Sequence, residues 1–268
     1  EEELGITFRA FGAGWRYDWQ SDGMLSRVVR PDGKEVSFAY DALGRRTEKT
    51  YEDVATHFVW DGNVPLHEWQ EVSSDAEKTN ITTWLFEQNT FIPAAKLAAN
   101  GESFSIVSDY LGTPLQAFDN NGNKVWEQEL DIFGRKRTGN NNSSFIPFKY
   151  QGQYEDIETG LYYNRFRYYE PNTGTYISQD PIGLAGNNPT LYGYVNDINT
   201  HLDVLGLTII PTVTRGANKE ILTAEATIKK SDLGTGTNTN AASRKYARSL
   251  GNVDDDAGHM IGKQLGDR

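Results

Sequence analysis

A short pattern, Tyr-Asp followed by a glycine turn, returns along the first half of the chain and limits its fold more than any other feature. The copies are Tyr17-Asp18, Tyr40-Asp41 and, in degenerate form, Trp60-Asp61-Gly62. Between the turns the residues alternate between apolar and polar, as in KEVSFAY, which is the period of a β-strand. Asp-Gly and Leu-Gly pairs supply the positive-φ positions of hairpin turns. The pattern therefore predicts hairpins stacked side by side, each relying on its neighbours to bury its apolar face.

The composition agrees with a β-rich protein. The 268 residues include 14 Tyr, 12 Phe and 6 Trp, and such side chains suit a pleated surface. An ordinary antiparallel sandwich would also alternate, but it would not need the Tyr-Asp period. No run of about 18 apolar residues occurs, so no membrane-spanning helix is expected. The absence of Cys excludes disulfides and thiolate metal sites, and the net charge of −11 argues against general attraction of nucleic acid.

A dense, tyrosine-rich block occupies residues 148–207 and contains YQGQYEDIETGLYYNRFRYYEPNTGTYISQDPIGL. This block closely resembles the C-terminal core signature of Rhs/YD-repeat proteins, which also occurs in the C component of bacterial Tc insecticidal toxins. The resemblance covers residues 15–207. It implies a mainly β fold, in which residues 1–147 form a spiralling antiparallel YD-repeat shell and residues 148–207 form an inward-curling plug.

The resemblance also implies that the plug is an intramolecular aspartic protease, which needs no cofactor. Asp180 and Asp203 each begin an Asp-x-x-Gly-Leu stretch, and they match the two catalytic aspartates of the family. Arg167 matches the family's essential arginine, and Arg165 is expected to be a neighbouring ion-pair residue. Two adjacent carboxyl groups can share one proton, so that one polarises a carbonyl while the other activates water.

The bond that the resemblance marks for cleavage joins Leu207 to Thr208, where aromatic residues nearly vanish from the chain. Val204 stands where the family often has proline, and because proline stiffens a turn, its loss is expected to slow cleavage without removing a catalytic group. A structural alternative is that both aspartates only cap turns, as Asp commonly does. Gly183 and Gly206 are expected to be turn positions.

Residues 208–268 are predicted to form a small α+β toxin domain. The stretch NTNAASRKYARSLG predicts a helix, with Asn240 as its N-cap and Gly251 as its stop. The ending NVDDDAGHMIGKQLGDR resembles the ββα-metal (His-Me finger) nucleases, which carry Asp-x-Gly-His. The resemblance implies that His259, in a motif with Asp256, is a general base, and that one Mg²⁺ ion neutralises charge at the scissile phosphate.

Three basic side chains on the predicted helix are placed to contact phosphates: Arg244, Lys245 and Arg248. The metal-binding Asn or His that these nucleases take from a following helix has no counterpart before Arg268. The nuclease half is therefore expected to be incomplete and inactive, with unknown metal ligands, and the acidic start EEELGITFRAF suggests a piece of a longer chain. The remaining histidines are expected to be ordinary polar residues: His57, His67 and His201.

Together these features predict part of an Rhs-type bacterial toxin, in which a self-cleaving core releases a nuclease held inside the shell. The family implies secretion and delivery into target cells by a type VI or related system. Its expected partners are a cognate immunity protein, a secretion-system spike or other shell components, and nucleic acid as the toxin's substrate. The alternatives are a non-enzymatic YD-repeat protein for adhesion or carbohydrate binding, and a tail that modifies protein or nucleotide targets. No glycine-rich nucleotide loop supports the last of these.

Overall fold

The computed structural model describes residues 14–72, 80–139, 144–186 and 188–207, together with the backbone of two strands at 212–215 and 221–225. Within these residues the regular structure is antiparallel β-sheet plus one short 3-10 turn, η2 (Gly183–Gly186), and there is no α-helix. The predicted β-shell and plug are confirmed. The helix expected from Asn240 lies outside the described residues, and the predicted domain boundaries stay predictions.

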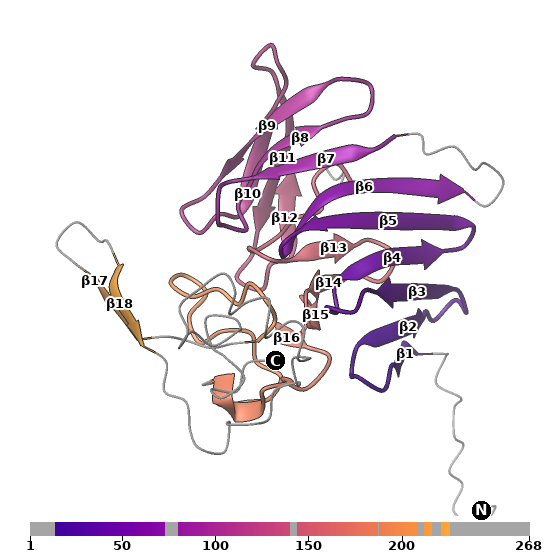
Figure 1. The fold of residues 1–268 in the computed structure, drawn as a ribbon, viewed down its shortest axis with the longest axis vertical. Helices are drawn as coiled ribbons and strands as arrows, with labels where there is room; N and C mark the ends of the chain where they lie inside the picture. Colours follow the sequence, from indigo (N-terminus) through magenta and orange to yellow (C-terminus); the bar gives the residue numbers. More distant parts are fainter. Residues whose placement is uncertain are drawn as a thin grey trace, which may run out of the picture.

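The shell is one 12-stranded sheet in which each strand pairs with the next strand along the chain (Figure 1). This order is what a series of hairpins produces, because a short turn can only return the chain antiparallel to the strand it has just left. The strands are β1 (Arg16–Trp19), β2 (Leu25–Val29), β3 (Glu35–Tyr40), β4 (Arg46–Tyr51), β5 (Val54–Asp61), β6 (Val64–Val72), β7 (Thr82–Phe86), β8 (Pro93–Leu97), β9 (Ser103–Ser108), β10 (Pro114–Phe118), β11 (Lys124–Leu130) and β12 (Lys136–Gly139).

The turns between many of these strands use the same Asp-x-x-Gly chemistry. In the turn between β3 and β4, the Asp41 amide donates to the carbonyl of Arg45 at 2.9 Å, and Gly44 donates back to Asp41 at 2.9 Å. Gly44 has a φ of +73°, a backbone conformation that glycine adopts easily and that residues with a side chain rarely adopt. The Oδ1 atom of Asp41 also accepts from the amides of Leu43 and Arg45. The same backbone pattern recurs at Asp109, Asp119 and Asp131.

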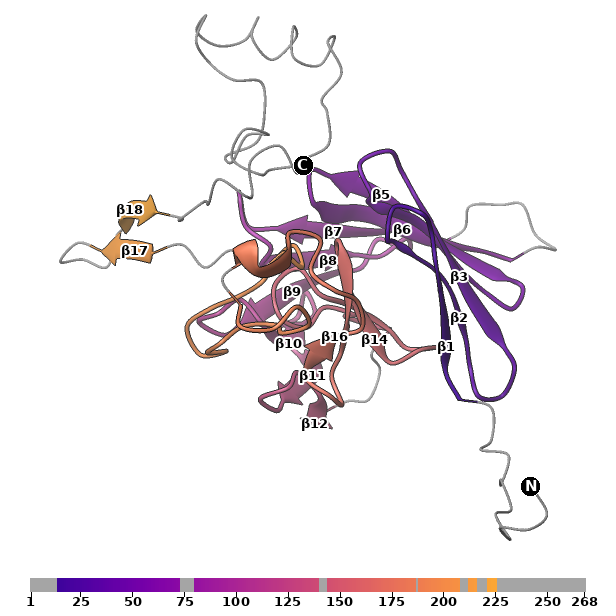
Figure 2. The ribbon, with the colours of Figure 1, turned by 90° about the horizontal axis from the view of Figure 1, so that it is seen from below.

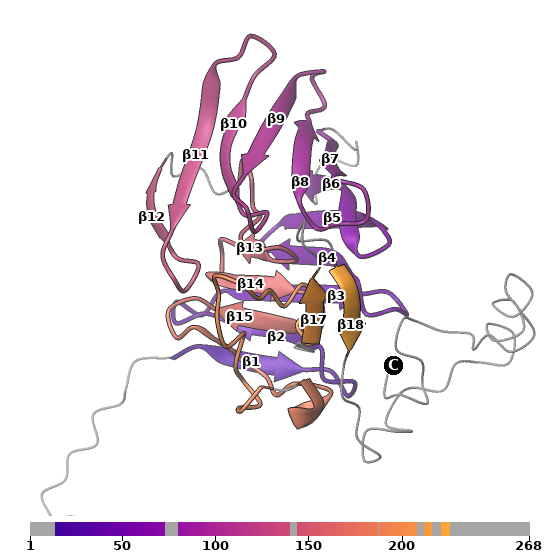
Figure 3. The same cartoon turned by 90° about the vertical axis from the view of Figure 1, so that its left-hand side faces the viewer.

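A second sheet forms the plug and lies on the concave side of the shell. Its strands are β13 (Tyr154–Asp156), β14 (Leu161–Asn164), β15 (Arg167–Glu170) and β16 (Thr175–Tyr176). Figure 2 shows the early and late shell strands on two sides of this sheet, and Figure 3 shows β14 and β15 beside β2 and β3. The large sheet therefore bends around the segment that follows it in sequence.

Two apolar clusters join the shell to the plug. In the first, buried side chains of β2 and β3 pack against rings and aliphatic groups of β14 and β15: Leu25, Val28, Val36 and Phe38 against Leu161, Tyr163 and Tyr168. In the second, later shell strands pack against the segment before β13: Trp84, Ile106, Ala117 and Trp126 against Ile146 and Phe148. One face of the hairpin stack is thus buried by the plug. A third cluster lies within the plug itself and consists of buried tyrosines: Tyr150, Tyr162, Tyr169, Tyr176 and Tyr194.

A buried ion pair also ties the two sheets together. Arg46 in β4 and Asp156 in β13 have fully buried side chains, and Arg46 Nη1 lies 2.6 Å from Asp156 Oδ2. The guanidinium also lies over the rings of Tyr163, at 4.5 Å, and Phe58, at 4.9 Å. Such a pair holds the sheets in one register, because losing either partner would leave an uncompensated buried charge.

After the plug, β17 (Thr212–Arg215) and β18 (Ile221–Glu225) pair as a separate antiparallel hairpin. No helix in the described ranges has the length and hydropathy needed to cross a bilayer.

Candidate active site

Three residues singled out in the sequence meet inside the plug. Arg167, at the start of β15, places Nη2 at 2.9 Å from Oδ2 of Asp180 and at 3.1 Å from Oδ2 of Asp203. The three residues are almost fully buried, with exposed fractions of 1, 7 and 3 %. Two carboxylates at this depth need a compensating charge, because burial disfavours an isolated ion. One guanidinium serves both.

The two aspartates reach this point through turns like those of the shell. Asp180 Oδ1 accepts from the amide of Ile182 at 3.0 Å, and Gly183 donates to the Asp180 carbonyl at 2.9 Å. Asp203 Oδ1 accepts from the amide of Leu207 at 2.8 Å, the same four-residue span as in the hairpins. In each turn Oδ1 caps the backbone while Oδ2 faces Arg167, so capping and charge pairing use different oxygens of the same group.

The fifth residue of the turn distinguishes the site from three of the shell turns, though not from the Asp109 turn, whose fifth residue is Thr113. In three shell turns its side chain donates to Oδ2 of the aspartate: Arg45 to Asp41 at 2.7 Å, Asn123 to Asp119 at 2.9 Å, and Arg135 to Asp131 at 2.6 Å. In the site turns this position is Leu184 or Leu207, which has no donor side chain. The Oδ2 atoms are therefore left for Arg167, which lies far away in the sequence.

Two hydrogen bonds from the start of β15 and the residue before it hold the segment that precedes the predicted cleavage point. Arg167 Nε donates to the carbonyl of Gly206 at 2.5 Å, and the amide of Phe166 donates to the carbonyl of Leu205 at 3.2 Å. Gly206 has a φ of +69°, and a Cβ there would lie 2.5 Å from the carbonyl oxygen of Asn164. Thr208 lies outside the described residues. The geometry thus fixes the chain up to Leu207.

Two further polar residues of the site were missed in the sequence. The Tyr176 hydroxyl donates to Asp203 Oδ2 at 2.8 Å, and its ring lies 3.7 Å from the Arg167 guanidinium carbon. Asn164 Nδ2 donates to the Tyr176 hydroxyl at 2.7 Å and to the Asp203 carbonyl at 2.8 Å. Burial, and then the charge of Asp203, raise the pKa of Tyr176 well above its ordinary value. The only signal in the sequence was a lone Asn inside a tyrosine-rich strand.

The expectation that Arg165 would form an ion pair at this site is wrong. Arg165 has a φ of +56°, which turns its side chain toward the shell. There it donates to the carbonyl of Leu43 at 2.7 Å and to Asn63 Oδ1 at 3.2 Å. The two arginines of this strand therefore have separate partners: Arg165 contacts shell turns and Arg167 contacts the carboxylates.

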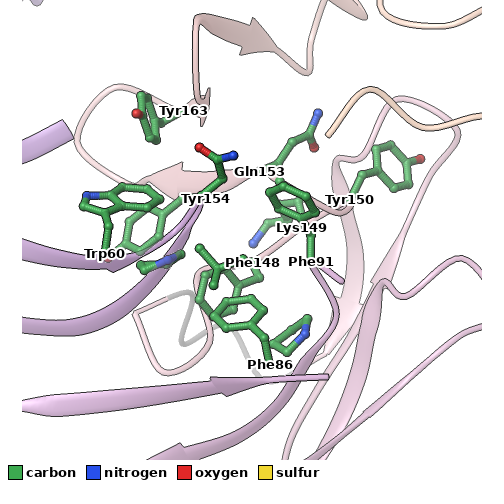
Figure 4. Close-up of a pocket in the computed structure, with 14 residues that line it drawn as sticks. Trp60, Phe86, Phe91, Phe148, Lys149, Tyr150, Gln153, Tyr154 and Tyr163 are labelled. Carbon is green, nitrogen blue, oxygen red and sulfur yellow. The ribbon is translucent and has the colours of Figure 1, made fainter. Parts of the chain in front are cut away.

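A small cavity of about 30 Å³ lies between the shell and the plug, with several aromatic rings around Lys149 and Gln153 (Figure 4). It has room for about two water molecules, which is far below the size of an ordinary ligand pocket. Gly152 lines this cavity, and its α-carbon faces the Val204 carbonyl so closely that no Cβ fits between them. Burial lowers the pKa of Lys149 to about 8, although Glu155 at 2.7 Å opposes the shift.

The residues proposed for nucleic-acid chemistry lie outside the described residues: His259, Asp256, Arg244, Lys245 and Arg248. Among the residues that the structure does describe, no group of three or more His, Asp or Glu is placed to hold a metal ion. The nuclease site and its Mg²⁺ therefore stay predictions.

Comparisons with known proteins agree with this architecture. The Teneurin YD-shell family matches residues 4–194. The probable deoxyribonuclease RhsA of Dickeya dadantii is 36 % identical over 259 residues, covering 94 % of this chain and 18 % of the relative. The double-stranded DNA deaminase toxin A of Burkholderia cenocepacia is 33 % identical over 223 residues, covering 72 % of this chain and 15 % of the relative. The chain thus spans less than a fifth of the length of either relative.

A solved structure has the same fold. The crystal structure of TcdB2-TccC3 superposes with a TM-score of 0.61 at 23 % identity, covering 73 % of this chain and 10 % of that chain. At this level of identity the likeness concerns the fold alone.

Proposed function

The chain belongs to the Teneurin YD-shell family, and from that premise we propose that its plug is an aspartic autoprotease that cuts the bond between Leu207 and Thr208. The observation that carries the proposal is the meeting of Asp180 and Asp203 at one nitrogen of Arg167. Two carboxyl groups brought to one buried point are the arrangement with which aspartic proteases hydrolyse peptides.

The reaction follows from that pair. Two neighbouring carboxyl groups in one buried site share a single proton, because a second negative charge there is unfavourable. The ionised carboxylate takes a proton from a water molecule, whose oxygen attacks the carbonyl carbon of Leu207. The protonated carboxyl group then gives its proton to the nitrogen of Thr208 as the carbon–nitrogen bond breaks. The products are a new carboxyl end at Leu207 and a new amino end at Thr208.

The surrounding contacts supply the orientation. Arg167 holds the carbonyl of Gly206 while it pairs with both carboxylates, and Asp203 accepts from the amide of Leu207. Fixing the reacting peptide in this way removes much of the entropy cost of bringing it to the catalytic groups. A guanidinium can do this because its planar fork carries five donors. Cleavage is therefore proposed to be intramolecular and independent of protein concentration.

We propose further that the segment after Leu207 belongs to a nuclease toxin enclosed by the shell. The match to RhsA covers 94 % of the chain and so must include residues beyond 207. The name of that relative favours DNA as the substrate, with His259 as general base, Asp256 in the same motif and one Mg²⁺ ion. Arg244, Lys245 and Arg248 would contact phosphates.

The proposed toxin also needs partners and a delivery route. A cognate immunity protein would bind the released segment, and a secretion-system spike or other shell components would carry it. On this proposal the protein is secreted and delivered into target cells by a type VI or related system. The support is the shell fold together with relatives whose names describe a probable deoxyribonuclease and a double-stranded DNA deaminase toxin.

A denaturing gel tests the autoprotease. The wild-type chain is expected to separate into two fragments, and the smaller one should begin at Thr208 by N-terminal sequencing. Asp180→Asn and Asp203→Asn are each expected to leave the intact 30.1 kDa chain. A single full-length species for wild type and both variants would reject the proposal and favour a non-enzymatic YD-repeat surface protein.

Plasmid DNA tests the nuclease separately. The cleaved chain is incubated with plasmid in Mg²⁺ and, in parallel, with a chelator. Digestion that depends on the metal and is lost in His259→Ala would support a nuclease, and it would overturn the expectation that this half is inactive. Digestion that persists in His259→Ala would remove that histidine from the mechanism.

A further inference from the structure

The last turn of the shell and the turn before the proposed cleavage point share one backbone geometry. In the shell turn (131–134), between β11 and β12, Asp131 Oδ1 accepts from the amide of Arg135 at 3.0 Å. In the cleavage turn (203–206), Asp203 Oδ1 accepts from the amide of Leu207 at 2.8 Å. The glycine at the fourth position has a positive φ in both, +79° and +69°. The two segments are therefore copies of one Asp-x-x-Gly turn.

Three tyrosines of the plug hold the shell turn by its main-chain carbonyls. The carbonyls at its first, third and fourth positions each accept a phenolic hydroxyl: Asp131 from Tyr150 at 3.0 Å, Phe133 from Tyr169 at 3.0 Å and Gly134 from Tyr162 at 2.9 Å. The side chain at the second position, Ile132, is exposed. These hydrogen bonds use atoms that every residue supplies, so they do not depend on which side chains occupy the second and third positions.

The plug holds the cleavage turn at the same three carbonyls. The donors are two side chains and one amide: Asp203 accepts from Nδ2 of Asn164 at 2.8 Å, Leu205 from the amide of Phe166 at 3.2 Å and Gly206 from Nε of Arg167 at 2.5 Å. The second and third positions carry Val204 and Leu205. In the shell turn they carry Ile132 and Phe133, so the same set of contacts accommodates different side chains.

The side-chain donors for the two turns lie next to each other on the β14–β15 hairpin. Tyr162 pairs across the hairpin with Tyr169, and Asn164 pairs with Arg167. Because alternate residues of a strand face the same side, these two cross-strand pairs share one face of the hairpin. All four side chains are buried. One pair therefore holds the shell turn, and the next pair along the hairpin holds the cleavage turn.

We propose that Asn164, the Phe166 amide and Arg167 form a binding site that selects the cleavage turn by its main-chain carbonyls and not by the side chains at its two variable positions. The ligand is a polypeptide segment in the Asp-x-x-Gly turn conformation, and the same hairpin binds a second such turn, from the shell, beside it. The inference rests on the proposed autoprotease and names the feature by which its substrate is recognised.

An exchange of turn residues tests the proposal. The double substitution Val204→Ile and Leu205→Phe gives the cleavage turn the variable residues of the shell turn. The chain is pulse-labelled in a cell-free translation system, and loss of the precursor is followed on denaturing gels. Cleavage is expected to remain within about fivefold of the wild-type rate. Each single variant is measured as well, so that the test stands if the double variant does not fold. A larger loss in a folded variant would overturn the proposal.

Asn164→Leu tests the contact with the first carbonyl of the turn. It keeps the size of the side chain but leaves the buried Asp203 carbonyl without this donor. Because Asn164 also donates to the Tyr176 hydroxyl, Tyr176→Phe is measured beside it to show how much of the loss comes from that second bond. Cleavage in Asn164→Leu should be slower than in Tyr176→Phe by about tenfold. Equal rates in these two variants would overturn the proposal.

Tyr162→Phe is the matched variant on the other turn. It removes the donor to the Gly134 carbonyl from the same face of the hairpin, and it should slow cleavage much less than Asn164→Leu does. Losses of equal size would show that the plug packing matters in general and that the cleavage turn has no binding site of its own. A wild-type chain that never cleaves would instead reject the autoprotease itself.

Discussion

Arg167 donates through Nε to the carbonyl oxygen of Gly206 at 2.5 Å, while its Nη2 atom contacts both aspartates. One side chain therefore holds the peptide segment and the acidic pair in a single frame. Any change that separates these contacts should reduce cleavage even where the fold survives.

Arg167→Lys is expected to slow cleavage by at least about 100-fold, because an ammonium is a compact point charge and cannot reach three partners as a planar fork does. The half-time of precursor loss on denaturing gels measures the effect. Arg165→Lys, in the same strand but bonded to shell turns, should cleave at a rate close to wild type. Equal cleavage rates for both variants would show that Arg167 has no role in cleavage beyond that of Arg165.

Gly206→Ala is expected to block cleavage, whereas Gly183→Ala should be far milder. Both glycines have positive φ, +69° and +62°, so both substitutions carry the same backbone strain. Only at position 206 does the new methyl group meet a fixed atom, the Asn164 carbonyl oxygen. The comparison of cleavage rates thus separates the effect of the steric contact at position 206 from the effect of backbone strain. Similar losses in both would show that strain alone matters.

Leu184→Arg should slow cleavage by placing a guanidinium at the fifth position of the Asp180 turn. In the shell, arginine at this position pairs with Oδ2 of its own turn, as Arg45 does with Asp41. The new arginine would draw Asp180 away from Arg167. Leu184 is 62 % exposed, so the substitution has little packing to disturb. Leu184→Gln is the control, and its cleavage should stay near the wild-type rate.

Arg46→Met is expected to lower the free energy of unfolding by about 3–5 kcal/mol, because it leaves the fully buried Asp156 carboxylate without its closest partner. Denaturant titration followed by tryptophan fluorescence measures this change. Arg27→Met removes ion pairs with Asp18 and Glu35 at the surface, and it should leave the unfolding midpoint nearly unchanged. Adding Asp156→Leu to Arg46→Met should restore part of the loss.

Lys149 gives a pH dependence of stability. Its pKa is about 8 in the fold against 10.5 for the ordinary side chain, so the unfolded chain binds more protons between these values. The free energy of unfolding should therefore rise as pH increases from about 8 to 10, with this group contributing about 2–3 kcal/mol. The raised pKa values of buried tyrosines act oppositely above pH 10. In Lys149→Met the free energy of unfolding should not rise over this pH range. If it rose in parallel with that of the wild type, the pH dependence would not come from Lys149.

The sequence predicted the parts of this fold that depend on local pattern. Alternation and glycine turns fix where strands and hairpins lie, so the 12-stranded order followed. The two aspartates and Arg167 were found through a resemblance and through a repeated turn. Arg46 and Asp156 were not found, because they are 110 residues apart and no periodicity links a buried charge to its partner. Tyr176 was hidden for a related reason: among many tyrosines, only the fold distinguishes the one that faces a carboxylate.

The fifth residue of the Asp-x-x-Gly turn suggests how a repeat protein acquires chemistry without new backbone. With arginine or asparagine in that place, the side chain donates to the aspartate of its own turn, and the turn serves only to reverse the chain. With leucine the fifth side chain offers no donor to the aspartate, and two such turns bring their carboxylates to the buried Arg167, where cleavage is proposed. On the proposed function, a turn that only reverses the chain and a turn that carries a catalytic carboxylate differ by a single side chain, which one mutation can change.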